Sequence, residues 1–232
     1  MPRHDTFGTD FEESGIKHRQ MRLILLFFSL LIGTSLITEG QNDQEAVKIL
    51  DKFSSSALAA PSVSMKFDMI TDNQAENTTK TISGSLILSK DKYRLELPDN
   101  IIWFNGETSW SLLPAEKEVT ISKPDKSDKS FFNQPSTIFT MYKEGYKKRL
   151  LEERADSYII DLYPEDLESE FIRIRLNINK QASELKSLEY KTKDGITITI
   201  NVRYFSLKEK QDPSAFVFQP GKYKDIEVID MR

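Results

Sequence analysis

Residues 81–97 have the sequence TISGSLILSKDKYRLEL. Two short runs in this stretch alternate apolar with polar side chains, and a polar segment separates them. The apolar positions are Ile82, Leu86 and Leu88 in the first run and Tyr93, Leu95 and Leu97 in the second. A period of two residues is typical of β-strands with one buried and one solvated face. The stretch therefore predicts two neighbouring strands that pack through one face.

The same alternation extends through most of the chain on both sides of this stretch. It begins at Val63, Met65, Phe67 and Met69. Further strands are expected at Ile101–Phe104, Ser109–Leu113, Glu118–Ser122, Lys148–Glu152, Ser157–Tyr163, Phe171–Ile178, Leu185–Thr192 and Ile196–Phe205. Asn105-Gly106 and Asp194-Gly195 are strong hairpin signals. Short connections predict a mainly β protein, an antiparallel meander of about eleven strands that curls into a barrel or a strongly bent sheet.

One segment before the strands has a helical pattern instead. Residues Asn42–Ala57 place apolar side chains at a spacing of three and four, which is typical of a helix that docks on a core through one face. That stripe consists of Ala46, Leu50, Phe53 and Ala57. Asn42 is expected to cap the helix, and Pro61 is expected to end it.

A second break in the alternation lies in the middle of the chain. Lys123–Gln134 is a polar loop that carries Phe131 and Phe132. Pro135 then opens the apolar segment Ser136–Tyr142, which suits a helical turn. We expect this segment to form a short helical lid, with Ile138, Phe139 and Met141 as its apolar residues.

The N-terminal residues 1–40 are expected to be a secretory signal peptide. Leu23–Ile37 is almost wholly apolar, follows basic residues, and precedes small ones. As a helix these residues would span about 22 Å, which is shorter than the roughly 30 Å of a bilayer core. Met21 is a possible true start. Cleavage after Gly40 would leave residues 41–232 as one exported domain.

The composition excludes several classes of chemistry. The chain has no cysteine, and its 2 histidines lie within residues 1–40, at His4 and His18. The exported domain therefore lacks disulfides, a Ser-His-Asp triad and the usual zinc ligands. A formal net charge of −4 is unsuited to sequence-independent nucleic-acid binding. We expect no cofactor, no metal, no nucleic acid and no enzymatic activity.

The remaining catalytic alternative is a carboxylate-based periplasmic enzyme such as a glycosidase. Glu152-Glu153 and the acidic residues between Glu165 and Glu170 could supply the carboxylates, but predicted turns at these positions favour solvated surface groups. Ser-x-x-Lys occurs at Ser89 and Ser183 about as often as chance predicts for this composition. No catalytic residue is therefore expected.

Several motifs, in the right order, resemble the periplasmic outer-membrane lipoprotein carrier proteins, the LolA family. The resembling segments are the helix before Ser64–Phe67, then Gly84–Arg94, Asn105–Trp110, Pro135–Phe139 and Phe216–Pro220. The chain departs from the family pattern at Asp91-Lys92, where the family has a proline, and at Pro220-Gly221, where it has a proline pair. Lys90 takes the place of a basic residue that works in lipoprotein transfer, with lysine instead of arginine.

The resemblance implies an incomplete, unclosed β-barrel whose concave face is covered by helices and holds acyl chains. The expected partners are tri-acylated lipoproteins, an inner-membrane ABC-type release complex, and an outer-membrane acceptor or the outer membrane itself. The protein is expected to be a periplasmic monomer. A carrier or sensor of another lipid on the same fold is the alternative, because fold does not determine cargo.

The candidate site residues combine that implication with side-chain chemistry. Flexible and aromatic side chains suit a wall that must adapt to acyl chains. The expected wall residues, each of which could instead simply pack a core, are Met65, Phe67, Met69, Leu86, Leu88, Tyr93, Leu95 and Trp110. Ile138, Phe139 and Met141 are expected in the lid, and Lys90 at the cavity mouth as the cargo-transfer residue.

Overall fold

A computed structural model describes residues 38–124 and 134–232. The expected signal segment Leu23–Ile37, Met21 and the aromatic pair Phe131 and Phe132 lie outside the described residues. The chain divides into two units, residues 1–41 and 42–232, and only the start of one helix is described in the first unit. Within the described residues, no helix is long and apolar enough to cross a membrane.

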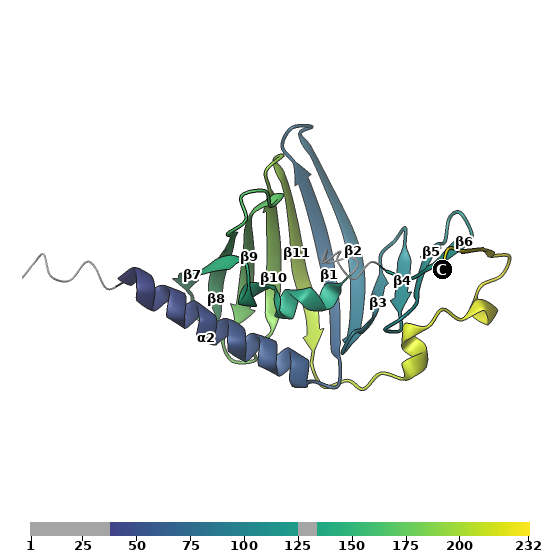
Figure 1. The fold of residues 1–232 in the computed structure, drawn as a ribbon, viewed down its shortest axis with the longest axis horizontal. Helices are drawn as coiled ribbons and strands as arrows, with labels where there is room; N and C mark the ends of the chain where they lie inside the picture. Colours follow the sequence, from purple (N-terminus) through teal and green to yellow (C-terminus); the bar gives the residue numbers. More distant parts are fainter. Residues whose placement is uncertain (1–37, 125–133) are drawn as a thin grey trace, which may run out of the picture. The chain divides into compact units, whose positions relative to one another are not determined.

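The second unit is built on one sheet of twelve strands, counted over the described residues (Figure 1). The strands are β1 (Val63–Asn73), β2 (Thr78–Ser89), β3 (Lys92–Glu96), β4 (Ile101–Phe104), β5 (Ser109–Leu113), β6 (Glu118–Ser122), β7 (Tyr146–Glu153), β8 (Ser157–Pro164), β9 (Phe171–Asn179), β10 (Leu185–Thr192), β11 (Ile196–Ser206) and β12 (Glu227–Asp230). The eleven expected strands all form, so apolar runs, alternation and hairpin turns were together a sufficient signal for them.

Two antiparallel meanders make up this sheet, and they join along its middle. The strand order is β12-β6-β5-β4-β3-β2-β1-β11-β10-β9-β8-β7. The first and last long strands pair antiparallel, with Met69 opposite Ile200. Because β12 and β7 end the order without pairing to each other, the sheet stays open, and the expected unclosed barrel is confirmed.

The twelfth strand was not expected from the sequence. β12 pairs parallel with β6, and Val228 lies opposite Val119. All four of its residues are exposed, so it carries no alternation of buried and solvated positions. Its pairing depends on the C-terminal segment returning to the edge of the sheet, which a local pattern does not report.

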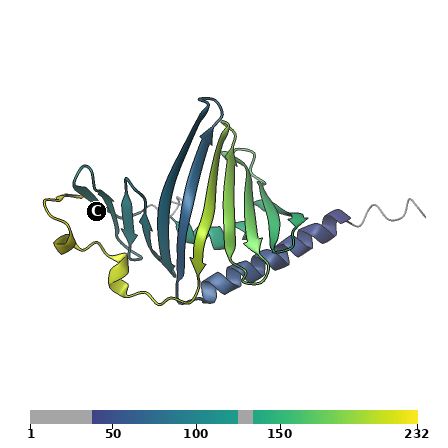
Figure 2. The same cartoon turned by 180° about the vertical axis from the view of Figure 1, so that it is seen from behind.

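Helix α2 (Thr38–Ala59) starts four residues before the expected Asn42 and ends before Pro61, as expected. Its stripe Ala46, Leu50, Phe53 and Ala57 is buried. These residues pack on the face of the sheet that carries Phe67, Leu86 and Leu176, here called the inner face. The opposite, outer face is the one seen when the molecule is turned around (Figure 2).

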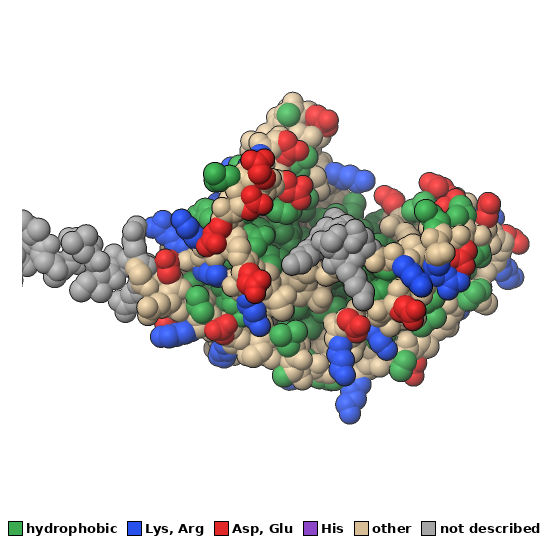
Figure 3. All heavy atoms as spheres, viewed as in Figure 1, with side chains coloured by type: hydrophobic (Ala, Val, Ile, Leu, Met, Phe, Trp, Pro, Cys, Tyr) green, Lys and Arg blue, Asp and Glu red, His purple; other side chains and the backbone are tan. Residues whose placement is uncertain are grey.

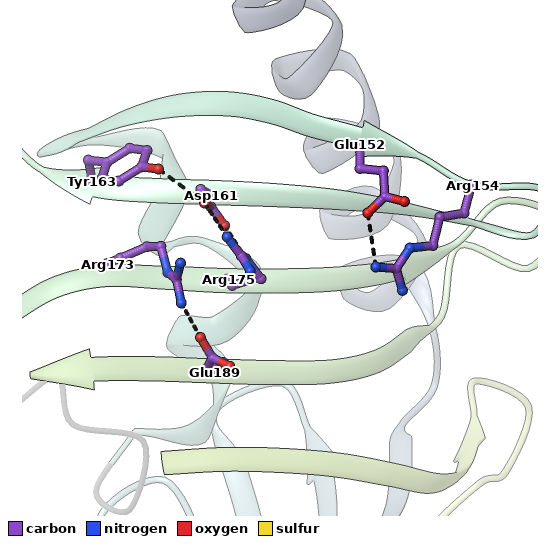
Figure 4. Close-up of polar contacts among 7 residues, drawn as sticks. All are labelled: Glu152, Arg154, Asp161, Tyr163, Arg173, Arg175 and Glu189. Atoms are coloured by element: carbon purple, nitrogen blue, oxygen red, sulfur yellow. Dashed lines mark hydrogen bonds and ion pairs between the residues drawn. The ribbon is translucent and has the colours of Figure 1, made fainter. Parts of the chain in front are cut away.

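The outer face of β8, β9 and β10 is held by charged pairs (Figure 4). The Asp161 carboxylate is 1% exposed and accepts two hydrogen bonds from Arg175, from Nε at 2.6 Å and from the terminal amino group at 2.8 Å. Tyr163 donates a third hydrogen bond at 3.1 Å. Arg173 pairs with Glu189 on the next strand. Asp161 is buried on the solvent-facing side of the sheet because these side chains cover it.

Gly84 gives the first stability prediction, because its backbone lies against a buried ring. A Cβ atom at this position would approach Phe67 Cζ to 2.6 Å and Leu97 Cδ2 to 2.9 Å. Gly84→Ala should therefore destabilise the protein by about 1–3 kcal/mol through overpacking. Chemical denaturation would measure this. Gly221→Ala, where a Cβ meets nothing within 4 Å, is the matched control. In the double variant Gly84→Ala with Phe67→Leu, the smaller side chain should relieve part of the overpacking. If the two changes in the free energy of unfolding simply add, the contact between positions 84 and 67 is contradicted.

Candidate functional site

The inner face of the sheet gathers most of the expected wall residues. Met65, Phe67, Met69, Leu86, Leu88, Tyr93 and Leu95 are all buried in one cluster together with α2. Their side chains share a face because each strand alternates and adjacent strands stay in register, as Leu86 opposite both Met65 and Leu95 illustrates. The interior of the second unit is therefore continuously apolar from β1 to β3.

Trp110 is the expected wall residue that the structure places elsewhere. It pairs with Trp103 across β4 and β5 and packs in a second cluster on the outer face. The inner-face position of β5 opposite Phe104 is Ser109 instead. β4 is apolar on both faces, since Phe104 packs on the main cluster and Trp103 on the second. The alternation of apolar and polar residues therefore could not predict the face of the sheet on which Trp110 lies.

The expected short helical lid forms as a pair of 3₁₀ turns. They are η1 (Pro135–Phe139) and η2 (Met141–Lys143), and we call residues 135–143 the strap. Thr140 between them has a φ of −127° and a ψ of −19°, which lie outside the helical region and interrupt the helical path. A segment this short, rich in β-branched residues, does not support an α-helix. The tighter 3₁₀ turn is the usual form of such short pieces.

The strap inserts side chains into the interior. Ile138 is 3% exposed and Phe139 is 2% exposed, and both belong to the main cluster. The Phe139 and Phe53 rings lie with centroids 5.2 Å apart, which joins the strap to α2. The Tyr142 hydroxyl donates a hydrogen bond of 2.6 Å to the Asp51 carboxylate of the same helix. Met141 is only partly buried, and it faces a cavity.

Two cavities flank the strap, one on each side. The larger has a volume of about 440 Å³ and is lined by Met141, Tyr146 and Ile174, among others. The smaller has a volume of about 250 Å³ and is lined by Tyr93 and Phe104 among others. Figure 3 shows hydrophobic side chains on the wall of the hollow between the long strands and the strap. Polar residues also line both spaces, with Lys143 and Glu144 at the larger one and Asp91 and Glu107 at the smaller one.

Lys90 lies in the turn between β2 and β3, next to the smaller cavity. Its side chain is exposed, and its backbone has a φ of +57°. The adjacent Asp91 lines the smaller cavity, and Asp91 Oδ2 would be 2.8 Å from a Cβ at Gly106. The two turns therefore touch at one end of the site. This places Lys90 beside the cavity, and its expected role in cargo transfer stays a prediction.

The carboxylates considered for catalysis are solvated. Glu152 accepts a hydrogen bond of 2.9 Å from Arg154, and this bond lowers the pKa of Glu152. A general acid at neutral pH needs the opposite shift. The acidic residues between Glu165 and Glu170 are exposed. Lys186 belongs to one of the Ser-x-x-Lys pairs, and its ammonium donates a hydrogen bond of 2.6 Å to the Asp156 carboxylate. This arrangement does not favour a carboxylate or Ser-Lys enzyme.

Two groups that the sequence analysis missed belong to the strap region. Tyr146 lines the larger cavity, and burial raises the pKa of its hydroxyl. The Asp51–Tyr142 hydrogen bond joins positions 91 residues apart. Asp51 stands on the polar side of the α2 sequence pattern, and nothing local marks it as a partner of the strap.

The Asp51–Tyr142 contact predicts a loss of stability at high pH. Burial first, and then the hydrogen bond to Asp51, raise the pKa of Tyr142 from 10.0 to about 12. Because the pKa of Tyr142 is higher in the folded state, the neutral phenol stabilises the folded protein. This stabilisation is complete below pH 10 and is lost as the pH rises to about 12. Urea denaturation of wild type and Tyr142→Phe from neutral pH upward would test this. Wild type should lose stability more steeply above pH 10, and parallel curves would contradict the assignment.

An open sheet that wraps an apolar interior around one helix and a short strap is an architecture suited to binding apolar groups. The chain belongs to the family described as outer membrane lipoprotein carrier protein LolA, which matches residues 36–191. The resemblance drawn from the sequence motifs is therefore confirmed. Among curated proteins, none matches this sequence.

Three solved structures are similar to this chain at low sequence identity. An uncharacterized conserved protein from Thermus thermophilus is 12% identical with a TM-score of 0.54, over 80% of this chain and 99% of that one. A putative outer membrane lipoprotein-sorting protein domain from Vibrio parahaemolyticus is 12% identical with a TM-score of 0.42, over 75% and 97%. A LolA superfamily protein from Nitrosomonas europaea is 12% identical with a TM-score of 0.41, over 75% and 97%. The Thermus likeness shows the fold.

Proposed function

We propose that this protein carries the acyl chains of lipoproteins across the periplasm. It would take tri-acylated lipoproteins from an inner-membrane ABC-type release complex and deliver them to an outer-membrane acceptor or to the outer membrane itself. The observation that carries the proposal is the strap, which fills an apolar interior with Ile138 and Phe139 between two cavities. The family to which the chain belongs supports a carrier.

The energetics of an acyl anchor explain why such an interior is needed. Each buried methylene is worth about 0.8 kcal/mol, so three chains of about 15 methylenes are worth on the order of 35 kcal/mol against water. A lipoprotein would not leave a membrane for water at that cost. Transfer into an apolar interior is nearly balanced, because one apolar environment replaces another. A carrier therefore needs a moderate apolar site that opens, and very tight binding would prevent delivery.

The strap is the element that would open this site. It is connected to α2 by the Phe53–Phe139 ring contact and the Tyr142–Asp51 hydrogen bond. When it moves outward, the spaces on its two sides become one, and Phe67, Leu86 and Leu95 become available as a wall. Acyl chains would then replace Ile138 and Phe139 against the same surface. The unclosed sheet allows this because its edge strands β7 and β12 are not paired with each other.

The test is release of lipoproteins from a membrane. Spheroplasts of the host are incubated with the protein purified from its periplasm, and the soluble fraction is analysed by size-exclusion chromatography and native mass spectrometry. We expect tri-acylated lipoproteins in soluble one-to-one complexes with the protein. N-terminal sequencing of the same preparation would test export from the cytoplasm, because removal of residues 1–40 would leave Gln41 as the first residue. A protein that acquires only free lipid, or that remains empty, would overturn the proposal.

A further inference from the structure

A second apolar cluster lies on the outer face, beneath the C-terminal segment that contains η3 (Pro213–Phe216) and η4 (Pro220–Lys222). Figure 2 shows this segment beside β3 and β4. Trp103 is 4% exposed and meets Phe218 edge-on at 5.5 Å and Tyr223 at 6.0 Å. Phe218 and Tyr223 stack at 5.3 Å. The rings fix the segment on the sheet and form one side of a small cavity.

This outer cavity has a volume of about 210 Å³ and brings together charged and aromatic groups. Arg94 and Trp103 line it from the sheet, and Gln219, Lys222 and Tyr223 line it from the C-terminal segment. Its volume lies below the range of about 300–1,000 Å³ typical of drug-sized ligands, so the cavity suits a small group. Tyr93 and Leu95, which flank Arg94 in β3, point to the inner face of the sheet. The outer cavity is therefore separate from the candidate acyl site.

The charges in this cavity favour an anion. The Arg94 guanidinium lies 5.6 Å from the centre of the Trp103 ring, and one of its amino groups pairs with Glu96. Glu96 also accepts a hydrogen bond of 3.0 Å from Ser85, so this carboxylate is engaged within the sheet. A guanidinium has five N–H donors in a rigid fork, so the Glu96 pair leaves donors for a ligand. Lys222 adds a second positive charge from the facing segment.

We infer that this outer cavity binds a phosphate group. A tetrahedral oxyanion accepts from the arginine fork and the lysine ammonium together. The Gln219 amide donates one hydrogen to the Ser214 carbonyl at 3.1 Å, and its second hydrogen is a neutral donor for the ligand. The rings of Trp103 and Tyr223 exclude water from one side, which strengthens these charge-assisted bonds. Arg94 and Lys222 carry two positive charges and Glu96 carries one negative charge, so the cavity has a net positive charge. The chain as a whole has a net charge of −4. The inference does not depend on the acyl-carrier proposal.

The test uses fluorescence from the chain itself. The sequence has 2 tryptophans, and both Trp103 and Trp110 belong to this cluster. In a Trp110→Phe background, Trp103 reports on the cavity alone. Titration with inorganic phosphate at constant ionic strength should give a saturable change that sodium chloride does not reproduce. Lys222→Gln and Arg94→Gln should each weaken the apparent affinity at least tenfold. Lys210→Gln, which removes an exposed lysine outside the cavity, is the matched control.

The source of the phosphate is decided in a second arm. Vesicles of phosphatidylcholine, with and without phosphatidic acid, are mixed with the same proteins and sedimented. Binding that requires phosphatidic acid and is lost in Lys222→Gln would assign a lipid headgroup. Binding of inorganic phosphate without vesicle binding would assign a free phosphate. No saturable response to either probe, or an equal response in Lys222→Gln, would overturn the inference. Lys222 is exposed, so its replacement should not disturb folding.

Discussion

Replacing Phe139 with aspartate should abolish lipoprotein release and should lower the free energy of unfolding by about 3–5 kcal/mol or more. The ring is 2% exposed and contacts Phe53. Loss of a buried phenylalanine typically costs that amount, and an ionised carboxylate is more unfavourable still in the same place. The strap would therefore leave the interior. It could not close again over bound acyl chains, because closing would bring the same carboxylate against an apolar surface, and release would be lost for that reason.

The measurement must separate a displaced strap from a generally unfolded protein. Hydrogen exchange should increase in residues 135–143 of Phe139→Asp while the long strands β1 and β11 remain protected. Val228→Asp is the matched control, because Val228 is 54% exposed and the same change there should leave stability and release unaffected. Phe139→Leu should retain release, because it keeps the site apolar. Wild-type release by Phe139→Asp would contradict the role of the strap.

Removal of the Arg175 guanidinium should destabilise the protein by roughly 3 kcal/mol, the lower end of what an orphaned buried charge costs. Arg175→Met leaves the Asp161 carboxylate, which is 1% exposed, without its two-bond partner. Tyr163 still donates to Asp161, which keeps the expected loss at this lower end. Urea denaturation at neutral pH would measure the change.

Figure 4 also contains the matched control for this prediction. Arg154 and Glu152 form an ion pair of 2.9 Å, but their side chains are 52% and 49% exposed. Water screens such a pair, so Arg154→Met should change stability little. The double variant Asp161→Leu with Arg175→Met should recover much of the loss, because a well-packed apolar pair can replace a buried ion pair. Equal effects of Arg154→Met and Arg175→Met would contradict the assigned burial.

The strands were predictable because their signal is local. Alternation at Phe67, Leu86 and Leu95 marks the buried side of each strand, and the structure places these residues in one cluster. The α2 stripe was predictable for the same reason, with a period of 3.6 in place of 2. The motifs that resemble the LolA family were also readable along the chain, and the family match over residues 36–191 agrees with them.

The errors and omissions arose where two faces or two distant segments compete for the same side chain. Trp110 has the alternation of a wall residue, yet its pairing with Trp103 places it on the outer face. The strap residues were recognised as apolar, but the contact of Phe139 with Phe53 of α2 depends on tertiary packing. Asp51 and Tyr142 are separated by 91 residues, so neither predicts the other.

Which side chains can be buried, where the chain turns, and what chemistry is absent could be read directly from residue types and their spacing, because propensity and periodicity act over a few neighbouring residues. The side on which each apolar residue is buried depended on tertiary pairing. β4 is apolar on both faces, and only the packing of α2 on one side and of the C-terminal segment on the other assigned Phe104 to the interior and Trp103 to the outer cluster. The same long-range packing brought Lys222 to the cavity that Arg94 lines, and it closed the strap over the interior. Contacts between segments that are distant along the chain leave no pattern in the local sequence.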